Sequence, residues 1–144
     1  MLTKRWAFSA LGMPGGETFW VIPGYFGFET ALNTGALFGQ LQHQVQYLAI
    51  FSIVALIGVV FWFVFGRIGH DLPMTWTFGL ITGGILGNLY DRLGLWSNAG
   101  VQAVRDWILF QYSPELKWPN FNIADSLLVC GACLLFILSW RKPE

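Results

Sequence analysis

Two aspartates in the second half of the chain lie where a carboxylate is hard to accommodate. Asp125 is the fifth residue of FNIADSLLVCGACLLFILSW (121–140), beside an apolar run long enough for a membrane helix. Asp106 lies in AVRDWILF. Two carboxylates held close together cannot both ionise cheaply, so they share a proton. One can then take a proton from water while the other protonates the leaving group. Such a pair would hydrolyse a peptide bond without a metal or a nucleophilic side chain.

Each aspartate also has a structural interpretation. Asn122 could be the N-cap of the last helix, with Asp125 at its third position, where a carboxylate interacts well with the positive helix end. Asp106 could form an ion pair with Arg105 or Arg92. Taken singly, each aspartate is more simply explained as structural, so the catalytic interpretation depends on the two being brought together.

The elements that would position these residues are membrane helices. The chain is 55% hydrophobic and 11% charged with a net charge of zero, whereas soluble domains carry about 25% charged residues. This composition points to lipid rather than nucleic acid as the partner. A span needs about 20 apolar residues, and the ranges 45–66, 72–93 and 122–140 satisfy this.

The remaining segments are predicted to lie outside the bilayer. Residues 1–44 contain no span, and within them 19–38 are rich in Gly, aromatic residues and turn signals that favour short strands on the membrane surface. Residues 94–121 are predicted to be an outer loop. Arg67 and Arg141-Lys142 place the cytoplasmic side by the excess of basic residues. This topology gathers a polar set at the outer end of the helices: Asn33, Asn88, Arg92, Asp106 and Asp125.

The second predicted span has two further features. Gly79, Gly83 and Gly87 recur at four-residue intervals, which predicts a face that another helix can approach closely. Asn88, Asp91 and Arg92 follow on one side of the same helix, where an interhelical hydrogen-bond cluster is an alternative to a catalytic role. We expect no cofactor and no metal, because the Cys130-Cys133 pair supplies only half of a four-ligand zinc site.

Four segments in order resemble the motifs of the lipoprotein signal peptidases (signal peptidase II): ALNTGALFG (31–39), GGILGNLYDRLG (83–94), VRDW (104–107) and FNIADS (121–126). The resemblance implies a membrane α-helical bundle with four spans in the family and three in this chain, plus a small β-rich segment on the outer surface. It implies an aspartic endopeptidase that cleaves diacylglyceryl-modified bacterial prolipoproteins before the lipidated cysteine. It further implies the inner membrane, an active site towards the periplasm, contact with membrane lipid, and inhibition by globomycin-type peptides.

The resemblance also implies roles for single residues. Asp106 and Asp125 would be the catalytic pair, with Asp106 expected to hold the shared proton because the helix N-terminus favours charge on Asp125. Substrate-binding or pair-supporting roles would fall to Asn33, Asn88, Arg92 and Asn122. Structural roles would fall to Lys4, Gly83, Gly87 and Asp91.

The chain departs from the family pattern in three respects, one of which is that the segment between Arg92 and Asp106, LGLWSNAGVQAVR, is longer than the pattern leads us to expect. The chain also begins MLTKRW, so that Thr3-Lys4 resemble the end of a D-Q-x-[S/T]-K motif whose helix and aspartate would lie upstream of Met1. Arg105 and Trp107 replace the usual neighbours of Asp106, and we expect Arg105 to point away from the pair, towards headgroups or water. Two alternatives follow from the sequence: an inactive family member, or a transport subunit with an aspartate in a proton relay.

Overall fold

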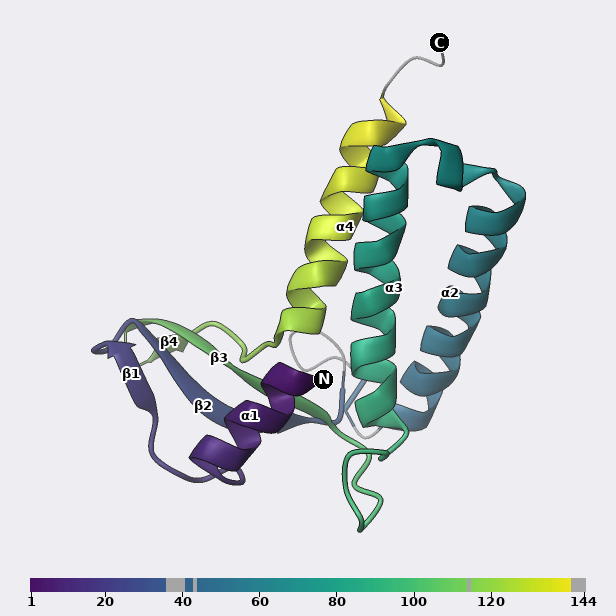
Figure 1. The fold of residues 1–144 in the computed structure, drawn as a ribbon. Coiled ribbons are helices and arrows are strands. Elements are labelled where there is room, and N and C mark those ends of the chain that lie inside the picture. The colour runs from purple at the N-terminus through teal and green to yellow at the C-terminus, as the bar shows by residue number, and fades with distance from the viewer. Residues whose placement is uncertain (36–40, 43, 114, 141–144) are drawn as a thin grey trace.

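The computed structural model describes residues 1–35, 41–42, 44–113 and 115–140. It has two parts, a set of three long helices and a small sheet that carries a short N-terminal helix at one end of the set (Figure 1). Arg141, Lys142 and residues 36–39 of the first motif lie outside the described residues. The basic pair that helped to orient the chain is therefore not placed.

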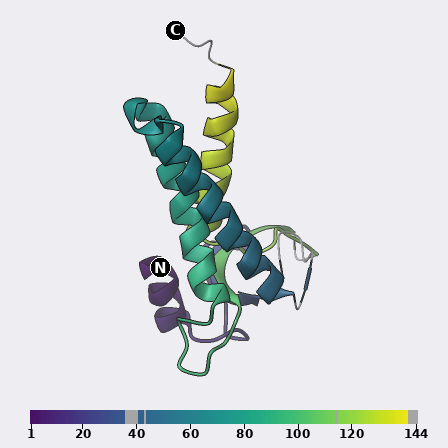
Figure 2. The same cartoon turned by 90° about the vertical axis from the view of Figure 1, so that its right-hand side faces the viewer.

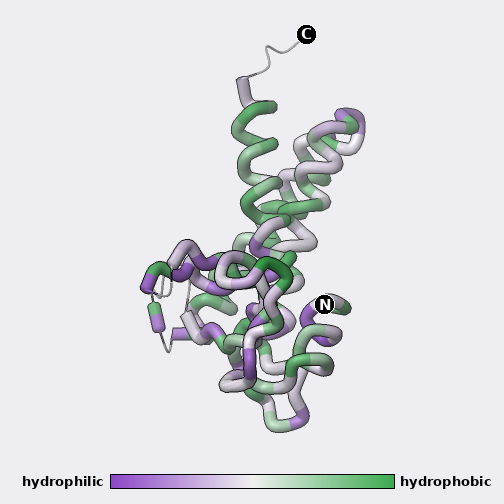
Figure 3. The backbone as a smooth tube through the Cα atoms, turned by 90° about the vertical axis from the view of Figure 1, so that its left-hand side faces the viewer, coloured by the Kyte–Doolittle hydropathy of each residue, from purple (hydrophilic) through white to green (hydrophobic). Residues whose placement is uncertain are grey.

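The three long helices lie within the three ranges predicted to be spans. They are α2 (Val45–Phe65), α3 (Leu72–Arg92) and α4 (Ile123–Ser139), with α3 between the other two (Figures 1 and 2). A 3-10 turn, η2 (Ile68–His70), joins α2 to α3. In the described part of the chain, α2 is the helix long and apolar enough to cross a membrane, while α4 is apolar but shorter. The helices are mainly hydrophobic along their length, and hydrophilic segments gather in the sheet and its loops (Figure 3).

Glycines allow α3 and α4 to pack closely. A Cβ added to Gly84 would lie 2.5 Å from Leu128 Cγ, and one added to Gly87 would lie 2.8 Å from Ala124 Cβ. Gly83 faces the same helix at 3.6 Å from Leu127. The predicted glycine face therefore packs on α4 through Gly83 and Gly87. Gly79 has no atom of the described residues within 4 Å of its added Cβ.

Replacing Gly84 with leucine is expected to lower the free energy of unfolding by about 1–3 kcal/mol, the usual cost of overpacking. The added side chain would collide with Leu128 and with the Ala124 carbonyl oxygen. Gly79→Leu is the matched control, because it adds the same side chain to open space on the same helix. Unfolding of both variants in detergent measures the difference. Equal stability would show that the close approach of α3 and α4 is unimportant.

The sheet has the order β1-β2-β3-β4 and is antiparallel throughout. Its strands are β1 (Phe19–Ile22), β2 (Phe26–Asn33), β3 (Val104–Ser113) and β4 (Leu116–Lys117). The predicted turn at Pro23-Gly24 joins β1 to β2, and Gly24 has the positive φ of 76° that favours glycine. The strands predicted on the surface segment are thus present.

The expectation that 94–121 is a loop is wrong for its central part. Residues 104–113 form the longest strand and pair with β2, which comes more than 70 residues earlier in the chain. Arg105 and Asp106 interrupt the apolar pattern of this strand, and its partner lies far away in sequence. Both facts hide it from a local interpretation.

A short helix, α1 (Leu2–Leu11), packs on the sheet beside β2 and β3 (Figure 1). Buried Ala7 contacts the core formed with Trp107 and Ile108, around which four partly buried rings pack: Phe8, Phe26, Phe28 and Phe121. Apolar burial of this kind stabilises by about 25 cal/mol per Å² removed from water. This core fixes α1, and with it Lys4, against the end of α3.

Candidate active site

The candidate site lies where the start of α4, the end of α3 and the strands β2 and β3 meet. Ile108 N donates to Phe121 O at 2.9 Å, and Phe121 N donates back to Ile108 O at 3.2 Å. These two bonds hold the residues that precede α4 against β3. They bring Asn122 next to Asp106, although 16 residues separate the two in sequence.

Asn122 and Asp125 form a capping box, as their spacing predicts. Asn122 Oδ1 accepts from Ala124 N at 2.7 Å, and Asp125 Oδ2 accepts from Asn122 N at 3.0 Å. The bonds satisfy backbone donors that a helix start leaves without partners. The cap thus fixes Asp125 at the first turn of α4, in the orientation that also brings it to Asp106.

One nitrogen joins the two aspartates. Asn122 Nδ2 lies 2.6 Å from Asp106 Oδ1 and 2.7 Å from Asp125 Oδ2, so its two hydrogens can serve both carboxylates. Asn122 and Asp106 are almost completely buried. The structure therefore brings the two predicted catalytic residues together on a single shared donor, which is the arrangement on which the catalytic interpretation depends.

Asp125 receives more donors than Asp106 does. Besides the two bonds from Asn122, Asn88 Nδ2 donates to Asp125 Oδ1 at 2.7 Å. Asp106 accepts from Asn122 and, at 3.3 Å, from Asn33 Nδ2. Asn33 pairs with Val104 across β2 and β3, so it is a diagonal neighbour of Asp106 on the sheet. Donors favour the charged form of a carboxylate, so the negative charge is best accommodated on Asp125.

Burial, and after it the nearby charge of Asp125, raise the pKa of Asp106 to about 7. The hydrogen bonds from Asn122 and Asn33 and the charge of Lys4 oppose this rise. A carboxyl group with this pKa is about half protonated at neutral pH. It can therefore donate a proton under conditions in which an ordinary aspartate cannot.

A second buried cluster, centred on Asp91, lies next to the aspartate pair. Asp91 accepts from Lys4 Nζ at 2.8 Å through one oxygen and from Arg105 Nη2 at 2.8 Å through the other. The backbone N–H of Arg105 also donates to Asp91, at 2.9 Å. Asp91 is fully buried and both cations are nearly so. The carboxylate therefore ties β3 to α3 immediately beside Asp106.

The expected orientation of Arg105 is wrong. Its guanidinium turns inward to Asp91 and lies 4.8 Å from the centre of the Trp96 ring, instead of facing headgroups or water. A guanidinium is buried at low cost when a carboxylate and an aromatic face both receive it. The alternative ion pair between Asp106 and Arg105 is also wrong, because Asp91 takes that partner.

A cavity of about 910 Å³ opens onto the pair. Its polar side includes five of the predicted site residues, which are Asn33, Asn88, Arg92, Asp106 and Asp125. Arg92 Nε is buried and has no hydrogen-bond partner among the described residues. The apolar side comes from α2 and α4, through residues such as Phe51 and Leu128. Polar and apolar walls therefore meet at the two carboxylates.

Sequence reasoning missed three contributors to this region. Asn120 lines the cavity, and its place directly before the FNIADS motif was an available signal. Ser52 also lines it, as a hydroxyl within the long apolar run that follows Tyr47 of α2. The third is Arg105, which binds Asp91 and so ties β3 to α3 next to Asp106. The described residues contain no group of three or more His, Cys, Asp or Glu that could hold a metal ion.

Comparison with known proteins gives a consistent result. A family model described as signal peptidase (SPase) II matches residues 1–141. A lipoprotein signal peptidase of Rhodopirellula baltica is 46% identical over 144 residues, and the alignment covers 96% of this chain and 65% of that protein. One of Clostridium novyi is 34% identical over 150 residues, covering 99% of this chain and 90% of that protein. The chain thus spans just under two thirds of the length of the first relative.

Solved structures agree in fold. A bacterial membrane enzyme determined at 2.3 Å superposes with a TM-score of 0.77 and 29% identity, covering 99% of this chain and 85% of that one. A second, at 1.9 Å, gives a TM-score of 0.76 and 30% identity with the same coverage. The arrangement of sheet and helices around the two carboxylates is therefore shared with a membrane enzyme.

Proposed function

We propose, since this chain belongs to the signal peptidase II family, that it is a membrane aspartic endopeptidase that removes signal peptides from diacylglyceryl-modified bacterial prolipoproteins. Cleavage would fall before the lipidated cysteine. The observation that carries the proposal is the shared donor, because Asn122 Nδ2 lies within 2.7 Å of an oxygen of both Asp106 and Asp125. That geometry supports a pair that acts as one acid and one base.

The donors around the pair assign the two roles. Asp125, with three N–H donors, is the carboxylate that takes a proton from water as the water oxygen attacks the scissile carbonyl carbon. Asp106 is the acid that gives its proton to the leaving amide nitrogen as the C–N bond breaks. After the reaction, the proton taken up by Asp125 restores the shared proton of the pair.

Cleavage is expected to fall as the pH rises through about 7, because ionisation of Asp106 removes the acid. The predicted dependence of log kcat/KM on pH above that point has a slope of about −1, as for the loss of one proton. Rates of lipopeptide cleavage between pH 5 and 9 measure it, with detergent and substrate held constant. A profile that stays flat up to pH 9 would contradict the assignment of Asp106 as the acid.

The cavity supports a substrate that is partly lipid. Its apolar wall between α2 and α4 leads from the carboxylates towards the hydrocarbon-facing surface of the helices, where Phe51 and Val129 are exposed. A diacylglyceryl group could remain in the bilayer while the peptide bond beside it reaches Asp125. Arg92 Nε, which is buried without a partner among the described residues, is a donor available to a substrate carbonyl.

The proposal includes an orientation and a location. Three helices, α2, α3 and α4, would span the bacterial inner membrane, with the sheet and the aspartate pair at the periplasmic side. This placement agrees with the exposed aromatic residues of the sheet, such as Phe19, Phe110 and Tyr112, which suit a membrane interface. Membrane lipid would contact the helices, and a globomycin-type cyclic peptide would inhibit by occupying the cavity.

A matched pair of substrates tests the function. The purified chain in detergent is expected to cleave a diacylglyceryl-modified prolipoprotein peptide at least about 10²-fold faster than the same peptide without lipid, because remote binding energy is used in the transition state. Asp71→Asn is a control variant, because this exposed residue caps the start of α3 and does not line the cavity, and an asparagine can cap equally well. Equal cleavage of both peptides, or of neither, would contradict the proposal.

A further inference from the structure

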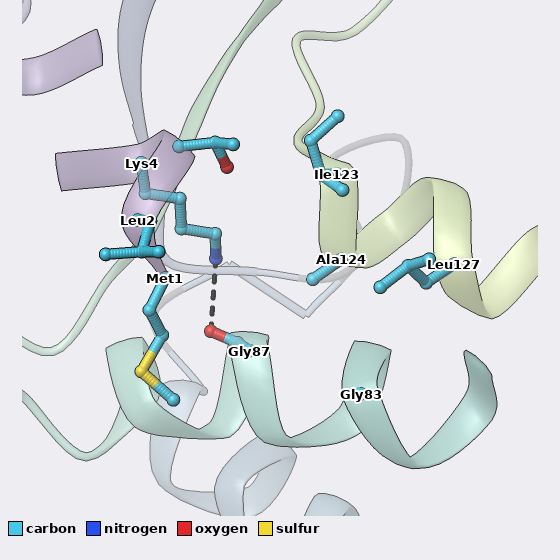
Figure 4. Close-up of a pocket in the computed structure, with 9 residues that line it drawn as sticks. Met1, Leu2, Lys4, Gly83, Gly87, Ile123, Ala124 and Leu127 are labelled. Atoms are coloured by element: carbon cyan, nitrogen blue, oxygen red, sulfur yellow. Dashed lines mark hydrogen bonds between the residues drawn. The ribbon is translucent and has the colours of Figure 1, made fainter. Parts of the chain in front are cut away.

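Lys4 crosses from α1 to the end of α3 and is buried there. It borders a small cavity of about 210 Å³, opposite Gly87 of α3 and beside Ala124 and Leu127 of α4 (Figure 4). Its ammonium donates to Gly87 O at 3.2 Å, Asn88 Oδ1 at 2.8 Å and Asp91 Oδ2 at 2.8 Å. An ammonium has three hydrogens and no acceptor, so these contacts use all of them.

The contact with Asn88 has a consequence for the catalytic pair. Because Lys4 can only donate, the side-chain group of Asn88 that faces it must be the carbonyl oxygen. The amide nitrogen of Asn88 is therefore turned the other way, towards Asp125 Oδ1 at 2.7 Å. The opposite orientation would place N–H groups against an ammonium and a carbonyl against a carboxylate.

Asp91 gives the amide a competing acceptor. Both Asn88 Oδ1 and Asp91 Oδ2 lie 2.8 Å from Lys4 Nζ, so they face the same point. With the ammonium removed, Asp91 Oδ2 would lose that donor and Asn88 Oδ1 would keep only the longer bond from Asn122 Nδ2, at 3.2 Å. The Asn88 amide could then turn its nitrogen to Asp91. Asp125 would then lose one of its three donors. Asn122 has no such choice, because Ala124 N holds its carbonyl at 2.7 Å.

We infer that Lys4 is a positioning residue that holds the Asn88 amide nitrogen towards Asp125 and thereby places the charge of the pair on Asp125 and the proton on Asp106. This inference rests on the proposed function, because it concerns the same pair. It makes α1 part of the catalytic apparatus although no atom of that helix is required to touch the substrate.

Lys4 affects the pKa of Asp106 both through its charge and through the orientation of the Asn88 amide, and these two effects can be distinguished. Three carboxylates act on Lys4, namely Asp91 on α3, Asp106 on β3 and Asp125 on α4. Arg105 on β3 shares Asp91 with it. As a cation, Lys4 lowers the pKa of Asp106, so loss of its charge alone would raise that pKa. Loss of the amide orientation would instead move the proton to Asp125 and lower the pKa at which Asp106 titrates. The two effects have opposite signs.

Titration of the carboxyl carbons tests the inference. The chain has four aspartates, so ¹³Cγ-labelled aspartate gives few signals, and the Asp106 signal is identified by its loss in Asp106→Asn. In detergent, Lys4→Met is expected to lower the midpoint of the Asp106 titration by about one pH unit, the size of effect of one hydrogen bond to a charged group. Lys117→Met, which removes a half-exposed cation paired with Glu29, is expected to leave it unchanged. Because loss of the Lys4 charge acts in the opposite direction, a lower midpoint in Lys4→Met can come only from the amide, and a higher midpoint would overturn the inference.

A charge-neutral variant decides the question if Lys4→Met does not fold. Asn88→Leu removes the amide at similar volume and leaves every charge in place, so it too is expected to lower the Asp106 midpoint by about one pH unit. An unchanged midpoint in Asn88→Leu would show that the amide does not set the position of the proton. Failure of the proposed function is recognised separately, because the titration needs no substrate, whereas the function is tested by cleavage of the lipidated peptide.

Discussion

Replacing either Asp106 or Asp125 with asparagine is expected to reduce kcat/KM for a diacylglyceryl-modified prolipoprotein peptide by about 10²–10⁴-fold, the usual contribution of a general acid or base. Asparagine keeps the size of the side chain but can neither take a proton from water nor supply one at neutral pH. Both carboxylates accept a hydrogen bond from the same nitrogen, Asn122 Nδ2. The measurement is initial rates of peptide cleavage in detergent.

The double replacement gives a sharper expectation. Residues that act as one unit lose their joint contribution when either is removed, so Asp106→Asn/Asp125→Asn should be only slightly slower than the slower single variant. The fold must be retained, which unfolding in detergent checks. Independent, multiplicative losses would mean that the two aspartates do not work as a pair. Retention of most of the activity by either single variant would remove that residue from the mechanism.

Replacing Asp91 with asparagine is expected to destabilise the protein by roughly 3–5 kcal/mol, the cost of breaking a buried ion pair and leaving the other charge unpaired. Two cations depend on this carboxylate, Lys4 and Arg105, and both are buried. In a chain of this size, the unfolding temperature in detergent should fall by roughly 10 °C or more.

Glu29→Gln is the matched control for the Asp91 replacement. Its ion pair with Lys117 is longer, at 3.5 Å, and partly exposed. Pairs of that kind contribute about 0–1 kcal/mol, so the unfolding temperature should change little. A similar small change for Asp91→Asn would contradict the view that Asp91 joins β3 to α3. A large loss of cleavage without loss of stability would instead assign Asp91 a direct chemical role.

The sequence predicted those features of the structure that depend on residues close together in the chain. The three long helices follow from apolar runs that need no knowledge of their neighbours, and the capping box of Asn122 and Asp125 depends on a spacing of three residues. Family membership was predicted from four short motifs in order and is confirmed by the match over residues 1–141. Each helix, the cap and each single motif is visible within a window of about 20 residues.

The errors arose where a distant partner decides the structure. β3 pairs with a strand more than 70 residues away, so its polar start at Arg105 and Asp106 was interpreted as a loop. Arg105 was expected to face water because its carboxylate partner, Asp91, lies on another element. Lys4 acts on Asn88 across 84 residues and only because α1 packs against the sheet. Buried ion pairs of this kind cannot be assigned without the fold.

The most direct test of the account is mass spectrometry of the products formed by the purified chain from a synthetic diacylglyceryl-modified prolipoprotein peptide, beside Asp106→Asn/Asp125→Asn. We expect one cut in the parent, with the lipidated cysteine as the new N-terminus, and no cut by the double variant over the same time. Cleavage at that bond by a folded double variant, or cleavage by the parent at another bond, would contradict the claim that this aspartate pair releases lipoprotein signal peptides.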